Sequence, residues 1–178
     1  TTVDEGATLT LSGSVAGGLV NNGIANIGGT VAGATTNTAD LSALNATLHN
    51  ITNTSGTVVL NNTSAGAVTN AADATFKATF GNFGDVQNSG TLTLISANAG
   101  NVTNTAEGNF TATGSGTLSS VNNAGTATLG ENNVVNGDVT NTAGSLTLDK
   151  NTITRNLIAT GGSFTVTSNG SEAGSLSG

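Results

Sequence analysis

The feature that most constrains this chain is a degenerate repeat of 15 to 19 residues that runs along almost its whole length. The string VTNTAGSLTL at 139–148 has relatives in VQNSGTLTL at 86–94, VNNAGTATL at 121–129 and ITNTSGTVVL at 51–60. Units this short cannot each hold a helical hairpin, so the repeat predicts a stack of small strand-based coils. Ten units follow when the first residue of each is taken as a marker, at Val3, Val20, Thr35, Ile51, Val68, Val86, Val102, Val121, Val139 and Leu157.

Hydrophobic and small polar residues alternate within each unit, as in Leu146, Thr147 and Leu148, and this period of two is typical of a strand with one buried side. Aligning the units gives two apolar columns, which predict the inward side chains. The first column contains Leu9, Ala25, Leu41, Val58, Phe76, Leu92, Phe110, Ala127, Leu146 and Phe164. The second contains Leu11, Ile27, Leu60, Ala78, Leu94, Ala112, Leu129, Leu148 and Val166, and only the third unit is expected to interrupt it.

A third apolar position precedes each new marker by three to five residues. It is occupied by Val15, Val31, Leu48, Ala65, Phe83, Ala99, Leu118, Val135 and Ile153. Each coil is therefore predicted to hold three short strands, joined by turns of Gly and Asn, and the absence of proline suits strands whose N–H groups all join a ladder. The sequence predicts an all-β chain, a single parallel β-helix (β-solenoid) of about ten coils, in one domain spanning 1–178 without a separate cap.

Asparagine recurs two residues after most markers, and stacked carboxamides can donate to one neighbouring coil while accepting from the other. The positions are Asn22, Asn37, Asn53, Asn70, Asn88, Asn104, Asn123 and Asn141. We interpret this column as a structural ladder at a tight bend, with Asn53, Asn70, Asn88, Asn104, Asn123 and Asn141 as its core.

Asp or Asn often stands immediately before the marker, at Asn50, Asp85, Asn101, Asp138 and Asn156. Two aspartates never fall in adjacent coils, where like charges about 4.8 Å apart would repel one another. We interpret these residues as turn chemistry and predict no metal site, because the calcium-binding Gly/Asp nonapeptide of some β-rolls does not occur.

Charge and composition argue against several classes of function. The formal net charge of −7 leaves no basic patch for phosphate groups, so nucleic-acid binding is not expected. The chain has no cysteine and a single histidine, which excludes disulfides and the usual zinc ligand sets. No apolar run reaches the roughly 18 residues of a membrane helix, so direct membrane insertion is not expected. No cofactor is predicted.

The chain offers little for catalysis. The only imidazole, that of His49, lies beside a turn and is interpreted as solvated. Asp149, Lys150 and Arg155 form the densest mixed-charge patch, which we interpret as ordinary surface charge. Sugar cleavage normally requires paired carboxylates, and the acids here are scattered. We therefore predict that the protein is not an enzyme; a sugar-cleaving alternative would depend on Asp149 or Arg155.

Outward threonines form a second pattern of interest, because flat threonine arrays are what ice-binding solenoids present. The candidate lateral face consists of Thr91, Thr93, Thr126, Thr128, Thr147 and Thr165. Val59 and Lys77 interrupt the same rows nearer the N-terminus, and threonine is also a favoured exposed residue of strands. A binding module that recognises ice or a glycan through this face is the alternative function.

The alternation of Val-x-Asn with Gly-(Thr/Ser)-Leu-Thr-Leu, as in VTNTAGSLTL, resembles the repetitive passenger domains of bacterial autotransporter adhesins and the shaft of filamentous haemagglutinin. The resemblance covers nearly all of the chain. It implies a right-handed β-helix that is secreted to the bacterial cell surface and acts in adhesion, aggregation or biofilm, and it carries over no catalytic residue. Neither a signal peptide nor a translocator segment is evident in the sequence.

The leading functional hypothesis joins this resemblance to the ends of the predicted solenoid. A β-helix exposes unpaired strand edges at its ends unless something covers them, and no cap is evident. We therefore expect a secreted structural or adhesive fibre subunit or shaft segment. Its expected partners are other copies of itself, joined head to tail, or neighbouring repeats of a longer chain, with surface glycans as further candidates.

Overall fold

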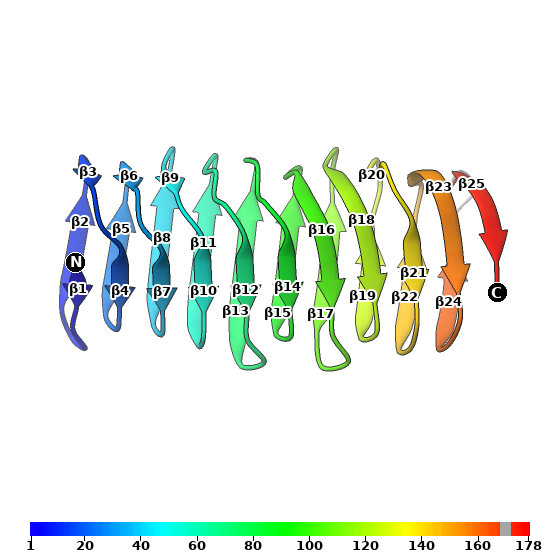
Figure 1. Cartoon of the computed structure of the whole chain (residues 1–178), viewed down its shortest axis with the longest axis horizontal. Coiled ribbons are helices and arrows are strands. Elements are labelled where there is room, and N and C mark those ends of the chain that lie inside the picture. The colour runs from blue at the N-terminus through cyan, green and yellow to red at the C-terminus, as the bar shows by residue number, and fades with distance from the viewer. Residues whose placement is uncertain (168–171) are drawn as a thin grey trace.

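All the elements in the described part of the chain are β-strands, stacked as the coils of one rod. The computed structural model describes residues 1–167 and 172–178; residues 168–171, which the predicted domain 1–178 includes, lie outside the described residues. Figure 1 shows the coils following one another from the N-terminus to the C-terminus along the long axis. The predicted all-β parallel solenoid of about ten coils is confirmed.

Two long parallel sheets form the main sides of the rod. The ten-stranded sheet contains β2 (Thr8–Leu11), β5 (Ile24–Ile27), β8 (Asp40–Leu44), β11 (Gly56–Asn61), β13 (Ala74–Thr79), β15 (Thr91–Ile95), β17 (Asn109–Thr113), β19 (Thr126–Leu129), β22 (Ser145–Leu148) and β24 (Ser163–Val166). The twelve-stranded sheet contains β1 (Thr2–Val3), β4 (Leu19–Asn21), β7 (Thr35–Asn37), β10 (Ile51–Asn53), β12 (Val68–Asn70), β14 (Val86–Asn88), β16 (Ala99–Asn104), β18 (Thr117–Asn123), β20 (Val134–Val135), β21 (Val139–Asn141), β23 (Thr152–Ala159) and β25 (Glu172–Ser177).

The third side of the rod changes along its length. Near the N-terminus it is a separate sheet of β3 (Ser14–Val15), β6 (Thr30–Val31) and β9 (Thr47–Leu48). Isolated bridges such as Ala65 with Phe83 continue it through the middle coils. Further toward the C-terminus, β16, β18 and β23 each extend from this third side into the twelve-stranded sheet. In these coils one continuous strand therefore joins the two sides.

The core is a narrow column of side chains between these sides, and the predicted inward columns are confirmed. Leu41 pairs with Val58, Val58 with Phe76 and Phe76 with Leu92, all at most 1% exposed. Phe76 stands beside the small Ala78 in its strand, and its ring meets that of Phe83 edge to face with centroids 6.0 Å apart. Burying each large side chain stabilises the fold by about 2 kcal/mol, so the apolar columns hold the coils together.

Two details of the predicted register are wrong. In the second coil the inward residues are Leu19 and Asn21, and Val20 faces outward and is 42% exposed. The doublets Leu-Val and Asn-Asn allow either register, and the burial of the larger Leu19 decides between them. In the third coil the second column is not interrupted, because Ala43 fills it between Ile27 and Leu60 with 2% exposure.

Candidate functional site

The predicted asparagine ladder is a continuous chain of hydrogen bonds inside the rod. Each Nδ2 donates to the Oδ1 of the next asparagine toward the C-terminus, over 2.7 to 2.9 Å. All of its members are at most 1% exposed. They are Asn21, Asn37, Asn53, Asn70, Asn88, Asn104, Asn123 and Asn141, so the ladder includes the six predicted core asparagines and has Asn21 in place of Asn22.

The ladder asparagines also donate hydrogen bonds to backbone carbonyls of the bend that follows them. Asn88 Nδ2 donates to Gly90 O at 2.9 Å, and Asn123 Nδ2 donates to Gly125 O at 3.0 Å. At one end of the ladder the equivalent position is Val3, which pairs with Asn21. These bonds leave the ladder residues with internal partners, so the column is a structural element and not an open site.

Two further buried asparagines were missed by the sequence reasoning. Asn133 donates to Gly130 O at 2.9 Å and to Ala112 O at 3.1 Å, at a different corner of the coil. Asn151 also donates to Gly130 O, at 2.6 Å. The sequence does contain a signal for these asparagines, because each lies two residues before an inward apolar residue. This asparagine recurs in only two coils, however, which is too few to stand out as a column.

The Asp and Asn residues before the markers complete the backbone ladder at another corner. Asp85 Oδ1 accepts from Asn101 N at 2.8 Å, Asp138 Oδ1 accepts from Asn156 N at 3.1 Å, and Asn50 Oδ1 accepts from Ala67 N at 3.0 Å. In each case a side-chain oxygen takes the place of a backbone carbonyl in the preceding coil. This supports the interpretation of these residues as turn chemistry.

The predicted threonine face lies on the outer side of the ten-stranded sheet. The register stacks the outward residues of β15, β17, β19, β22 and β24 into an uninterrupted column, Thr93, Thr111, Thr128, Thr147 and Thr165. The neighbouring column reads Thr91, Asn109, Thr126, Ser145 and Ser163. This half of the sheet carries no charge in either column, and Thr111 is a member that the sequence reasoning missed.

The N-terminal half of the same sheet is different. Ile24, Val59 and Leu44 are 47%, 41% and 55% exposed there, and Asp40 and Lys77 stand in the same outward columns. The hydroxyl lattice is therefore confined to the C-terminal half of the rod.

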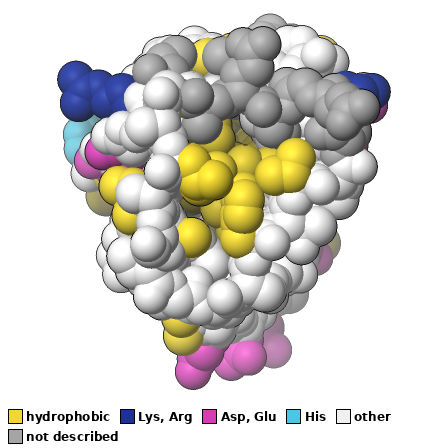
Figure 2. All heavy atoms as spheres, turned by 90° about the vertical axis from the view of Figure 1, so that its right-hand side faces the viewer, with side chains coloured by type: hydrophobic (Ala, Val, Ile, Leu, Met, Phe, Trp, Pro, Cys, Tyr) yellow, Lys and Arg dark blue, Asp and Glu magenta, His cyan; other side chains and the backbone are white. Residues whose placement is uncertain are grey.

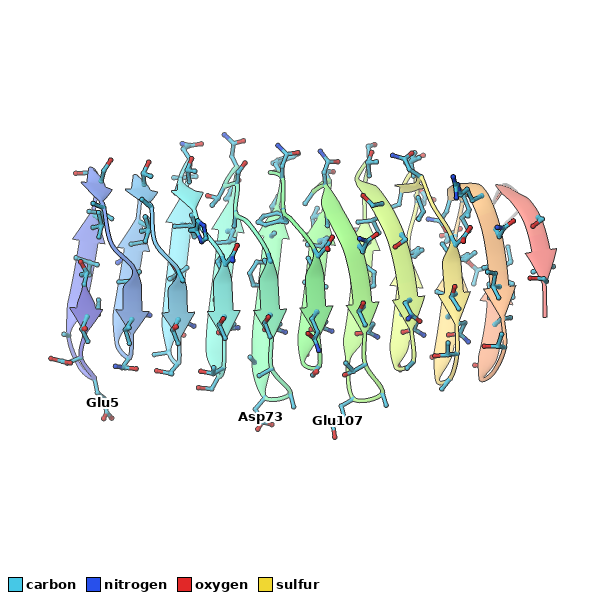
Figure 3. The ribbon with its side chains drawn as sticks, viewed as in Figure 1. Glu5, Asp73 and Glu107 are labelled. Carbon is cyan, nitrogen blue, oxygen red and sulfur yellow. The ribbon has the colours of Figure 1, made fainter. Side chains whose placement is uncertain are left out.

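Three acidic residues project from one edge of the rod (Figure 3). Glu5, Asp73 and Glu107 lie in turns that are closed by bonds such as Ala74 N to Ala71 O at 3.1 Å and Gly108 N to Thr105 O at 3.0 Å. The turns belong to separate coils, and within 1–167 and 172–178 no three His, Cys, Asp or Glu residues gather as metal ligands.

In the mixed-charge patch weighed for catalysis, the ion pair of Lys150 is with a residue outside the predicted set. Lys150 forms an exposed ion pair with Glu131 of the preceding coil, with Nζ 2.8 Å from Oε1. This hydrogen bond and the charge of Glu131 raise the pKa of Lys150. His49 and Arg155 are exposed.

No helix in the described part of the chain is long and apolar enough to cross a membrane. The chain matches no protein-family model, and it matches neither a curated protein nor a solved structure.

Proposed function

We propose that this chain is a non-enzymatic structural or adhesive element of the bacterial cell surface, a secreted β-solenoid rod that extends axially through its end coils. The repeat motif supports the surface location, because VTNTAGSLTL resembles the shafts of bacterial adhesins. The rod shape supports the structural role, since a stack of coils spans distance with few residues at each level.

The observation that carries the proposal is a set of exposed apolar side chains at the C-terminal end of the described rod. Figure 2 looks along the rod at its C-terminal end and shows apolar side chains in the middle of that face. Val166 and Leu176 are 49% and 69% exposed, whereas Leu148 and Leu157, which precede them in the same columns, are 0% and 5% exposed. An exposed apolar patch with free strand edges favours a partner that continues the stack.

The partner is either a second copy or neighbouring repeats of a longer chain. In a head-to-tail contact between copies, the first coil presents Leu9 and Leu11, which are half-buried. Continuing the two inward columns places Phe164 over Leu9 and Val166 over Leu11. This contact is heterologous and does not close, so it generates a filament.

Electron microscopy of the purified chain at moderate salt tests this proposal. Ten coils of about 4.8 Å predict filaments with an axial repeat of roughly 48 Å. Val166→Lys and Leu176→Lys place charges in the contact and should leave discrete rods, whereas the matched control Val20→Lys, on an exposed lateral position, should still form filaments. Discrete rods from the unmodified chain would contradict self-association.

The hydroxyl lattice favours one second candidate, the recognition of ice by the threonine face. Five threonines in register lie about 4.8 Å apart along the rod, and the neighbouring column, which is hydroxyl-bearing except at Asn109, lies roughly 6.6 Å away. Thermal hysteresis of the freezing point tests it. Thr128→Lys in the middle of the lattice should abolish the effect, and Thr52→Lys on the other sheet should preserve it.

A further inference from the structure

We infer that a groove on the outer face of the twelve-stranded sheet binds a neutral oligosaccharide. The groove crosses β12, β14 and β16 and has a volume of about 380 Å³. We call it the Gln87 groove. Its polar lining consists of Thr69, Asp85, Gln87, Asn101 and Thr103, and Ala67, Val68 and Val86 are its apolar residues. The inference rests on the adhesive part of the proposed function and names a ligand for it, on the sheet that lies opposite the sequence-predicted threonine face.

The floor of the groove presents polar groups that the protein itself does not use. The register pairs Thr69 with Gln87 and Gln87 with Thr103, and all three are exposed because their strand neighbours are the buried valines and ladder asparagines. Their side chains make no hydrogen bond to any other described residue. Two hydroxyls and a carboxamide therefore lie in a row, about 4.8 Å apart, free to exchange hydrogen bonds with a ligand.

Asp85 adds an oriented acceptor beside this row. Its Oδ1 accepts from Asn101 N at 2.8 Å and from Asn101 Nδ2 at 3.1 Å, which fixes the plane of the carboxylate. Its Oδ2 has no hydrogen bond from the described residues. A carboxylate oxygen held in place in this way forms strong, charge-assisted bonds with sugar hydroxyls.

Small residues create the hollow. Ala67 lies at the same register position as Asp85, one coil earlier, and supplies only a methyl group there. Gly100 stands behind the carboxylate, where an added Cβ would lie 2.4 Å from Asp85 Oδ1. The bulk that Asn50 and Asn101 provide in the same column is thus missing at Ala67, which leaves space next to the polar row.

The chemistry of the groove selects the class of ligand. Five of the eight residues that line the groove carry hydroxyl, amide or carboxylate side chains, which suits a polyhydroxylated molecule. The Asp85 charge and the net charge of −7 repel acidic sugars and phosphates. A neutral oligosaccharide, which offers many donors and acceptors and no charge, fits both conditions.

The test is a titration of the full chain, labelled with ¹⁵N, with cellohexaose, maltohexaose and chitohexaose, followed by backbone amide shifts. At least one hexasaccharide should shift the amides of Thr69, Gln87 and Thr103. Gln87→Ala should weaken binding about tenfold, which corresponds to the loss of one net hydrogen bond. Ala67→Leu, which fills the hollow and leaves Asp85 and Gln87 in place, should abolish it.

Asn122→Ala is the matched control, because Asn122 is exposed in the same outward column and lies outside the groove. It should bind as the unmodified chain does. Absence of shifts in the groove with all three hexasaccharides, equal binding by Ala67→Leu, or equal affinity for an anionic hyaluronan hexasaccharide would each overturn the inference. If the chain forms filaments but binds no sugar, only the proposal of an oligosaccharide site is overturned. If discrete rods bind sugar, only the proposal of axial self-association is overturned.

Discussion

Asn53 Nδ2 donates a hydrogen bond of 2.9 Å to Asn70 Oδ1 in the next coil, and both side chains are at most 1% exposed. The same carboxamide of Asn53 also donates to Thr75 O at 2.9 Å, which lies in the same coil as Asn70. One side chain thus forms two hydrogen bonds to the next coil, at a bend where backbone groups would otherwise lack hydrogen-bond partners. This arrangement makes the ladder sensitive to any residue that cannot both donate and accept.

Asn88→Ala should destabilise the rod by about 3 kcal/mol, because it breaks the ladder, leaves the buried Asn104 Oδ1 without its donor and removes the side-chain bond to Gly90 O. Urea denaturation followed by far-ultraviolet circular dichroism measures this loss. Asn122→Ala, next to the ladder but exposed, should change the free energy of unfolding by less than about 0.5 kcal/mol. Equal effects of the two substitutions would contradict a structural role for the ladder.

Asn88→Asp adds a pH dependence. A buried carboxyl favours its neutral form, so its folded pKa should rise above the unfolded value of about 3.9. A raised acid pKa means that the folded state holds its proton more tightly, and stability relative to the unmodified chain should therefore fall as the pH rises through this range. Denaturation of both chains at acidic and neutral pH measures the difference, and a constant difference would contradict the prediction.

Thr35→Val should stabilise the protein by about 1 kcal/mol. Thr35 lies between Leu19 and Ile51 in a buried column, it is 1% exposed, and among the described residues its Oγ1 is the buried side-chain atom without a hydrogen-bond partner. Valine has the same shape and removes the cost of burying an unpaired hydroxyl. A differential scanning calorimetry comparison with Thr52→Val, an exposed control, checks this, and a lower Tm for Thr35→Val would refute it.

Much of the fold could be predicted from the sequence because the same weak alternation of apolar and polar residues recurs in every coil. A single Leu-x-Leu is ambiguous, but the columns through Phe76 and Phe110 repeat in every coil, so their register is fixed by many residues at once. The second coil shows where this fails. Leu19-Val20-Asn21-Asn22 satisfies the pattern in two registers, and only the three-dimensional fit of the larger leucine selects one.

The surfaces were less predictable than the core. The threonine columns could be read from the repeat, apart from Thr111, whose strand begins with Asn109 and so hides the pattern. The Gln87 groove could not, since it depends on the missing bulk at Ala67 beside a carboxylate from another coil. Sequence alone shows neither the hollow nor the fact that the side chain of Gln87 makes no hydrogen bond to another described residue.

Phe80→Asn should raise stability by about 1 kcal/mol. Phe80 has a φ of 58° and is 52% exposed, and this left-handed conformation costs a bulky residue about 1 to 2 kcal/mol. The equivalent residues of neighbouring coils are Asn62, at 47°, and Ser96, at 48°, which tolerate it better. Urea denaturation measures the gain. A loss of stability would instead indicate that the phenyl ring contributes packing that outweighs its backbone strain.

Gly90→Ala should destabilise the rod by about 3 kcal/mol, because the new Cβ would lie 2.2 Å from Ala71 O and 2.3 Å from Ala74 O. These carbonyls belong to the long turn of the preceding coil, whose bond from Ala74 N to Ala71 O is 3.1 Å. Gly23 and Gly125 lie under the long turns of Glu5 and Glu107 in the same way, so each protruding acidic turn is closed over a glycine of the next coil.

This relationship predicts a coupling between turn and glycine. Deleting Ala72 and Asp73 shortens the turn and withdraws the two carbonyls, so Gly90→Ala should cost much less in the shortened chain than in the full-length one. Free energies of unfolding for the two single changes and their combination measure the coupling. Gly13→Ala, where an added Cβ meets nothing within 4 Å, is the control and should be close to neutral. Strict additivity of the turn deletion and Gly90→Ala would show that the clash arises elsewhere.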